Sequence, residues 1–131
     1  MLQTAFTKES PDTRITFRST YSVHQMDLLE KGGLEAGIVV LPCVTDGFCV
    51  RRVWRDELSL AVPDNHRLAV EDGIALKDLQ EEPFIWMAKS LNPFLYDHLL
   101  KCCRGLGLVP NIVREVMTGT EALAWLPADS A

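Results

Sequence analysis

Residues 15–41 read ITFRSTYSVHQMDLLEKGGLEAGIVVL, and this stretch carries the pattern that predicts the fold. Residues 15–18 alternate apolar and polar side chains, which is typical of a half-buried strand. Ser22 then occupies the position of an N-cap before a helical run, and Gly32 ends that run. Residues 37–41 are continuously apolar, which favours a strand buried on both faces, as in a parallel sheet. Strand, helix and strand with short links predict a βαβ unit with a right-handed crossover.

The rest of the chain continues this alternation of β-rich and helical runs. The sequence predicts the end of a helix in residues 2–9, extended pieces in 49–54 and 57–62, a helical turn in 76–79, strands in 84–87 and 112–116, and helices in 91–106 and 118–126. The expected architecture is α/β with a mostly parallel sheet. Ligands of such sheets bind at the carboxyl ends of the strands, where helices begin.

Composition and charge exclude several classes of protein. The chain has 131 residues, 47% of them hydrophobic, with 13 basic and 18 acidic side chains and therefore a net charge of −5. An intrinsically disordered chain would be poorer in apolar residues, and an acidic chain does not hold nucleic acid by its own charge. The longest apolar run, residues 36–44, contains Pro42 and is too short to span a membrane. The first ten residues lack the pattern of a secretory signal, so we expect a cytoplasmic protein.

Cysteines and histidines give no sign of a metal centre or of a catalytic site. Cys43, Cys49, Cys102 and Cys103 form no C-x-x-C pair, so we expect reduced thiols that serve as small core residues; a redox pair of Cys43 with Cys49 is the alternative. The histidines are too widely spaced for a metal motif, and neither a phosphate-binding glycine loop nor a nucleophile elbow occurs. The sequence therefore predicts no catalytic residue, no metal and no cofactor.

Three segments of the chain, in the order in which the family has them, resemble one protein family. The effector-binding domain of LysR-type transcriptional regulators contains three characteristic segments. This chain has runs that resemble them: LLEKGGLEAGIVVLP (28–42), WRDELSLAVPDNHRLA (54–69) and IALKDLQEEPFI (74–85). Arg67 departs from the family pattern, which usually has proline after the histidine at position 66. The order and spacing of the three segments agree with the family, and together they are specific.

The resemblance implies a two-lobed fold of the periplasmic-binding-protein type 2 class. It assigns residues 1–42 and 117–131 to a partial first lobe and residues 43–116 to a complete second lobe. It also implies a homo-oligomer, a dimer or a tetramer, that responds to a small-molecule effector, often a carboxylate or an aromatic acid. Contact with operator DNA would be made by a helix-turn-helix domain, which we do not find in these 131 residues.

The first group of candidate effector contacts is Thr20, Tyr21 and Ser22, at the start of a predicted helix. A serine hydroxyl and the unpaired N–H groups of a helix N-terminus can bind an anion. The resemblance places an effector-contacting hydroxyl at Ser22. A plain N-cap is the alternative role for this residue.

The second group lies between the predicted strand 84–87 and the helix after it, and comprises Ala88, Lys89, Ser90, Asn92 and Phe94. Lys89 could pair with a carboxylate, Ser90 and Asn92 could form hydrogen bonds, and Phe94 could stack on an apolar ring. The alternative is a solvated loop in which Ser90 or Asn92 caps the helix.

Thr118 is the last candidate, and the resemblance suggests a place at a hinge or pocket rim for it. Ordinary strand-to-helix turn chemistry is the alternative for this residue. Two functional hypotheses follow for the whole chain. The first is the effector-sensing domain of a LysR-type regulator, which is not an enzyme. The second is an oligomerisation or interaction module that no longer senses a ligand.

Overall fold

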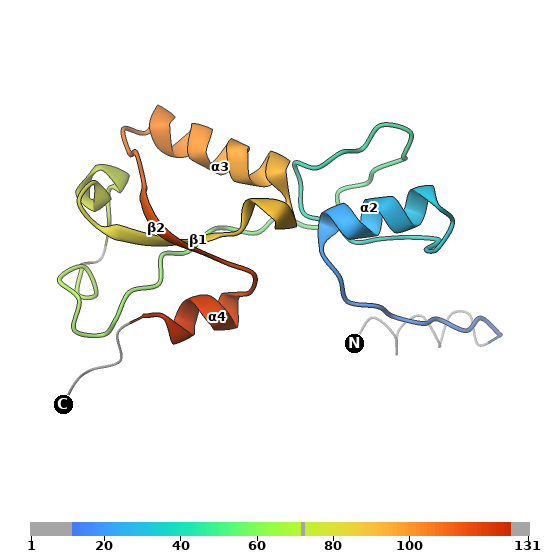
Figure 1. Ribbon diagram of the computed structural model, residues 1–131, viewed down its shortest axis with the longest axis horizontal. Coiled ribbons are helices and arrows are strands. Elements are labelled where there is room, and N and C mark those ends of the chain that lie inside the picture. Colours follow the sequence, from blue (N-terminus) through green and yellow to red (C-terminus); the bar gives the residue numbers. More distant parts are fainter. Residues whose placement is uncertain (1–11, 72, 127–131) are drawn as a thin grey trace.

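The computed structural model describes residues 12–71 and 73–126 (Figure 1). Its elements, in chain order, are α2 (Ser22–Glu30), the 3-10 turn η1 (Leu76–Leu79), β1 (Pro83–Met87), the 3-10 turn η2 (Lys89–Leu91), α3 (Pro93–Gly105), β2 (Asn111–Val116) and α4 (Gly119–Ala124). The helix predicted in residues 2–9 lies outside the described residues.

A parallel pair of strands forms the centre of the ordered part. Phe84 of β1 is in register with Ile112 of β2, and Met87 with Val116. α3 connects the two strands and lies on one side of them, while α4 lies on the other side (Figure 1). The predicted strand–helix–strand order in this half of the chain is confirmed, because apolar residues in both strands favour extended pairing beneath a helix.

Side chains at the helix starts explain where α3 and α4 begin. Asn92 caps α3 by accepting a hydrogen bond from the Leu95 N–H, and Pro93 follows at the first helical position. Thr118 caps α4 in the same way, through the Glu121 N–H. α3 starts two residues later than predicted, because residues 89–91 form the separate turn η2.

α3 ends at Gly105, and the chain then turns through Gly107, whose φ is +84°. This is the left-handed backbone conformation that glycine adopts without steric penalty. The turn directs the chain back towards β2, as the predicted helix end required.

The small core lies at the amino end of β1. Leu68, Leu79 and Leu108 are buried together, and Ile74, Leu76, Phe84 and Cys103 pack against them. Cys103 therefore has the predicted core role. Cys49 and Cys102 are exposed, so the prediction that all four thiols belong to the core is wrong for these two. Cys102 and Cys103 are neighbours on a helix, where successive side chains point about 100° apart, so only one of them can face the core.

Four segments predicted as strands carry no strand ladder in the described part of the chain: residues 15–18, 37–41, 49–54 and 57–62. The prediction that residues 37–41 are buried on both faces is wrong, since Ile38, Val40 and Leu41 are exposed. Their composition favours an extended backbone, but a strand also needs a partner. Between residues 12 and 126, apart from the undescribed residue 72, β1 and β2 are the strands that find one.

α4 packs against β2. At the end of α4, the Trp125 ring faces the Arg114 guanidinium, whose Cζ lies 3.6 Å from the ring centroid. None of the described helices is both long and apolar enough to cross a membrane.

Candidate functional site

The carboxyl ends of β1 and β2 bring the second group of candidate residues close to Thr118. The Ala88 N–H donates to the Val116 carbonyl oxygen at 2.8 Å, which extends the strand pairing by one residue. Beyond this bond, the Ser90 hydroxyl lies 4.0 Å from the Met117 sulfur, a weak contact. Parallel strands end at the same edge of a sheet, so the loop after β1 and the loop after β2 adjoin.

Thr118 and Glu121 hold the start of α4 with two hydrogen bonds. The Thr118 hydroxyl oxygen accepts from the Glu121 N–H at 3.0 Å, and the Met117 N–H donates to the Glu121 carboxylate at 2.9 Å. The turn chemistry considered for Thr118 is therefore present. Its hydroxyl hydrogen remains available as a donor.

The Lys89 ammonium is paired within the chain. Its Nζ lies 2.7 Å from the Asp97 carboxylate and 5.4 Å from the centroid of the Tyr96 ring. Both Lys89 and Asp97 are more than half exposed, so the pair is open to solvent and weak. A ligand carboxylate at Lys89 would have to compete with Asp97, a partner eight residues away that sequence reasoning did not identify.

Glu115 is a second residue that the sequence did not single out. Its carboxylate accepts from the Tyr96 hydroxyl at 2.8 Å and, at 3.4 Å, from the Lys89 backbone N–H. The hydrogen bond to Glu115 raises the pKa of Tyr96, because ionisation would remove its donor and set two negative charges together. No local pattern links Tyr96 to Glu115, since 19 residues separate them.

Asn92 is the buried polar residue of this site, with a side chain that is 3% exposed. Besides capping α3 with its oxygen, it donates through Nδ2 to the Val40 and Pro42 carbonyl oxygens, each at 3.0 Å. An amide nitrogen has two hydrogens, so both donors of Asn92 are in use.

Ser22 has a different role from the predicted one. The N-cap of α2 is Tyr21, which makes no side-chain cap bond, and Ser22 is the first helical residue. The Ser22 hydroxyl oxygen accepts from the Val40 N–H at 3.0 Å, across 18 residues. The prediction that Ser22 is the N-cap is therefore wrong, because Ser22 already lies within the helix and its hydroxyl binds a distant backbone donor instead of the first helical turn. The hydroxyl hydrogen is left to donate.

Val40 thus joins the two groups of candidates. Its N–H binds Ser22, and its carbonyl oxygen binds Asn92. Figure 1 shows α2 and α3 beginning near this point and running apart. Thr20 lies just before α2, where its carbonyl oxygen accepts from the Gln25 side chain. Phe94, in the first turn of α3, is 51% exposed.

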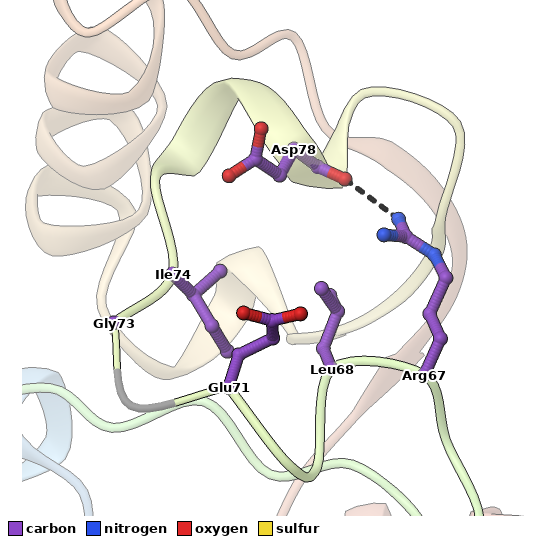
Figure 2. A pocket seen from close by; sticks show the side chains of 6 residues that line it. All are labelled: Arg67, Leu68, Glu71, Gly73, Ile74 and Asp78. Atoms are coloured by element: carbon purple, nitrogen blue, oxygen red, sulfur yellow. Dashed lines mark hydrogen bonds between the residues drawn. The ribbon is translucent and has the colours of Figure 1, made fainter.

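A separate hollow of about 350 Å³ lies by the turn η1, away from the predicted residues. Figure 2 shows its lining of Arg67, Leu68, Glu71, Gly73, Ile74 and Asp78. The Arg67 guanidinium donates to the Asp78 carbonyl oxygen at 2.8 Å and to the Glu82 carboxylate at 2.7 Å. The pairing with Arg67 is the largest cause of the lowered pKa of Glu82.

Residues 12–71 and 73–126 hold no cluster of three or more His, Cys, Asp or Glu side chains that could bind a metal ion. The arrangement at the carboxyl edge offers hydrogen-bond donors, one exposed aromatic ring and one weakly paired ammonium. These groups suit the binding of a polar or anionic small molecule.

Comparison with known proteins gives one consistent family. The family model for the LysR substrate binding domain matches residues 2–129. The chain is 32% identical over 110 residues to the HTH-type transcriptional regulator AlsR of Bacillus subtilis, covering 84% of this chain and 36% of that protein. It is 30% identical over 120 residues to the HTH-type transcriptional regulator XapR of Escherichia coli, covering 91% of this chain and 40% of that protein. The chain therefore spans less than half the length of these relatives.

Among solved structures, the C-terminal domain of a probable LysR family transcriptional regulator from Rhodococcus sp. RHA1 superposes with a TM-score of 0.67. The superposition covers 95% of this chain and 60% of that one, at 23% sequence identity. The likeness shows a shared fold.

Proposed function

This chain belongs to the LysR substrate binding domain family, with its periplasmic-binding-protein-like α/β fold, and from that premise we propose that it senses a small-molecule effector for a LysR-type DNA-binding transcriptional regulator. The proposed role is binding, without catalysis, in the cytoplasm. We assign contact with operator DNA to a helix-turn-helix domain of the whole regulator and signal transmission to a homo-oligomer. The division into a partial first lobe and a complete second lobe is part of this proposal.

The observation that carries the proposal is the position of Val40 between Ser22 and Asn92. Residues from two helix starts, 70 positions apart in the sequence, each bind the same backbone unit. This arrangement supports one shared site for the candidates Thr20, Tyr21 and Ser22 and the candidates Ala88, Lys89, Ser90 and Phe94, with Thr118 at its rim. An effector between them would contact both halves of the molecule.

The hydrogen-bond inventory favours an anionic ligand. The Ser22 hydroxyl accepts from the Val40 N–H with one lone pair and keeps its hydrogen, so it can donate to an acceptor atom of a ligand. The first turn of α2 has no side-chain cap, which leaves N–H groups and the positive end of the helix dipole for the same ligand. A carboxylate fits both features, and the exposed Phe94 ring suits an aromatic acid.

The proposed mechanism is a shift between arrangements of the two halves. A ligand that contacts both halves binds more tightly when they are close, so its binding favours that arrangement. Its differential affinity for the two arrangements limits how far it can shift them. An oligomer interface coupled to the same change would report ligand binding to the DNA-contacting part of the regulator.

A thermal-shift panel of small carboxylates and aromatic acids tests the proposal. A true effector raises the melting temperature, because ligand at 100 times its Kd stabilises the folded state by about 2.7 kcal/mol. Ser22→Ala should reduce that rise, whereas Ser59→Ala, the same change at an exposed serine outside the site, should leave it intact. A chain shown to be folded by circular dichroism whose melting temperature no acid raises would contradict the proposal.

A second candidate function is association without sensing. It rests on the exposed apolar side chains of residues 49–60, which include Val53, Trp54 and Leu58. Large exposed apolar patches often mark interaction surfaces. Co-purification of the chain with a full-length relative would support this function, and a strictly monomeric species in sizing experiments would count against it.

A further inference from the structure

We propose that Asn92 is a positioning residue, which clamps the crossover segment, residues 40–42, to the start of α3 and so fixes where Ser22 stands relative to the loop 88–91. This inference rests on the proposed sensing function and deepens it. It moves Asn92 from the residues that touch a ligand to those that set the geometry of the site.

The contacts of Asn92 carry the first step. Its oxygen holds the Leu95 N–H at 3.2 Å, and its nitrogen holds two carbonyl oxygens of the crossover segment at 3.0 Å each. With 3% exposure and both donors occupied, Asn92 has no hydrogen to offer an effector. The Asn92 side chain therefore connects the start of α3 by hydrogen bonds to a segment 50 to 52 residues earlier in the sequence.

The second step follows the chain of bonds to Ser22. The peptide group of Val40 lies next to the clamped carbonyl, and the Val40 N–H donates to the Ser22 hydroxyl. Within the described residues, Asn92 therefore makes the hydrogen bonds that link residues 20–42 to residues 83–126. In Figure 1, α2 and α3 begin near each other and run apart.

The third step is the cost of breaking the clamp. The amide of Asn92 is shielded from water, so removal of its donors leaves two carbonyl oxygens without that partner. Those oxygens then need new partners, and the crossover segment, in which Val40 and Leu41 are exposed, can shift to bind water instead of α3. A change at Asn92 thus alters the geometry between the halves, whereas a change at an ordinary cap frays only its own helix.

Two substitutions separate the clamp from the cap. Asn92→Asp keeps an oxygen that caps α3 as well as asparagine does, removes both donors, and sets a carboxylate against two carbonyl oxygens. Asn92→Ser is an equally good cap, is uncharged, and has a shorter side chain with a single donor. If Asn92→Asp and Asn92→Ser change exchange and distances in the same way, the cause is loss of the clamp and not the charge that aspartate adds.

Thr118→Ala is the matched control, because it removes a cap of the same kind from α4 without any hydrogen bond to the crossover segment. Hydrogen exchange is measured on the whole chain for the four proteins without added ligand. The two windows compared are residues 38–43, which contain the crossover segment, and residues 93–98, which contain the first turns of α3. In parallel, spin labels at the exposed positions Glu30 and Lys101, in a background without native cysteines, report the distance between α2 and α3.

Both Asn92 variants should speed exchange of the Val40 amide, which donates to Ser22 beside the released carbonyl oxygens, by about fivefold, and should broaden the distance distribution between α2 and α3. Exchange in residues 93–98 should stay unchanged, because the cap is kept. Thr118→Ala should affect neither window. Unchanged exchange in residues 38–43 together with an unchanged distance distribution in both variants would overturn the proposal, as would faster exchange confined to residues 93–98.

The spin-label distances keep the proposal testable if a variant is unstable, because they are measured on the folded fraction at low temperature. The experiment uses no effector. A failed ligand panel would therefore overturn the sensing function while the clamp result stands, and a failed clamp would leave the Ser22 test of sensing untouched.

Discussion

Residues 83–126 and residues 12–62 contain similar apolar segments, but they satisfy their backbones in opposite ways. In residues 83–126, β1 and β2 pair with each other and both helices are capped by their own flanking side chains. In residues 12–62, α2 has no side-chain cap and the extended segments around it pair with no strand in the described part of the chain. Their peptide groups are left to water and to a few distant side chains.

Residues 83–126 therefore satisfy their backbone groups among themselves, whereas residues 12–62 depend on contacts with other parts of the chain. β1, α3 and β2 lie within 34 consecutive residues, so their pairing costs little loop-closure entropy. In residues 12–62, Val40 is held by hydrogen bonds to the Ser22 and Asn92 side chains. Substitutions in the two regions test this difference.

The largest expected effect comes from truncating one leucine in each region. Leu108, next to β2, is 1% exposed, and Leu58 is 81% exposed. Leu108→Ala should lower the free energy of unfolding by about 2–5 kcal/mol, because it removes buried methyl groups and leaves a cavity. Leu58→Ala should change it by less than about 0.5 kcal/mol. Urea denaturation of the two variants measures the gap, and equal losses would mean that Leu58 is buried in solution.

A smaller effect should follow from removing the cap of α4 and adding a cap to α2. Thr118→Ala removes the cap of α4 and should cost about 1 kcal/mol. Tyr21→Asp adds a side-chain acceptor at the uncapped start of α2 and should gain a similar amount, helped by the helix dipole. The check is the helical signal in circular dichroism during thermal unfolding. A destabilised Tyr21→Asp chain would show that the tyrosine ring, not the missing cap, governs the start of α2.

The smallest effect concerns the pH dependence of the Arg67–Glu82 ion pair beside the core. Arg67 lowers the pKa of Glu82 below its ordinary value of 4.5. Since the pKa is depressed in the folded chain, the stabilisation is present above pH 4.5 and is lost as the pH falls through the folded pKa. Urea midpoints should therefore fall between about pH 6 and about pH 3.

Glu82→Gln is the control for this titration. The variant should be less stable than the native chain at neutral pH, and the two should converge in acid. The effect is small, because Arg67 is exposed and its ion pair is open to solvent. Parallel titrations of the two proteins would show that Glu82 does not carry the dependence.

Local patterns predicted the parts of the fold that close locally. The apolar runs at residues 84–87 and 112–116 predicted strands, and the alternative in which Ser90 or Asn92 caps the next helix is right for Asn92, although the predicted helix begins at residue 91. Residues 37–41 show the limit of this reasoning. Their composition favours an extended backbone, but pairing needs a second strand whose position no local pattern contains.

The candidate site divides along the same line. Thr118 behaves as its position indicates, with a hydrogen bond three residues away. The roles of Ser22, Lys89 and Asn92 depend on partners 18, 8 and 50 to 52 residues away. Sequence reasoning found residue types able to donate hydrogen bonds, but not which of those donors the chain itself had already used.

The junction at Val40 also has a mechanical consequence. α3 has 13 residues and is therefore about 20 Å long, and it leaves the junction at its amino end. A rotation of only about 6° there would swing the far end of α3 through about 2 Å, as a lever about a fulcrum, given that length. Arg104, in the last turn of α3, would move with that end of the helix.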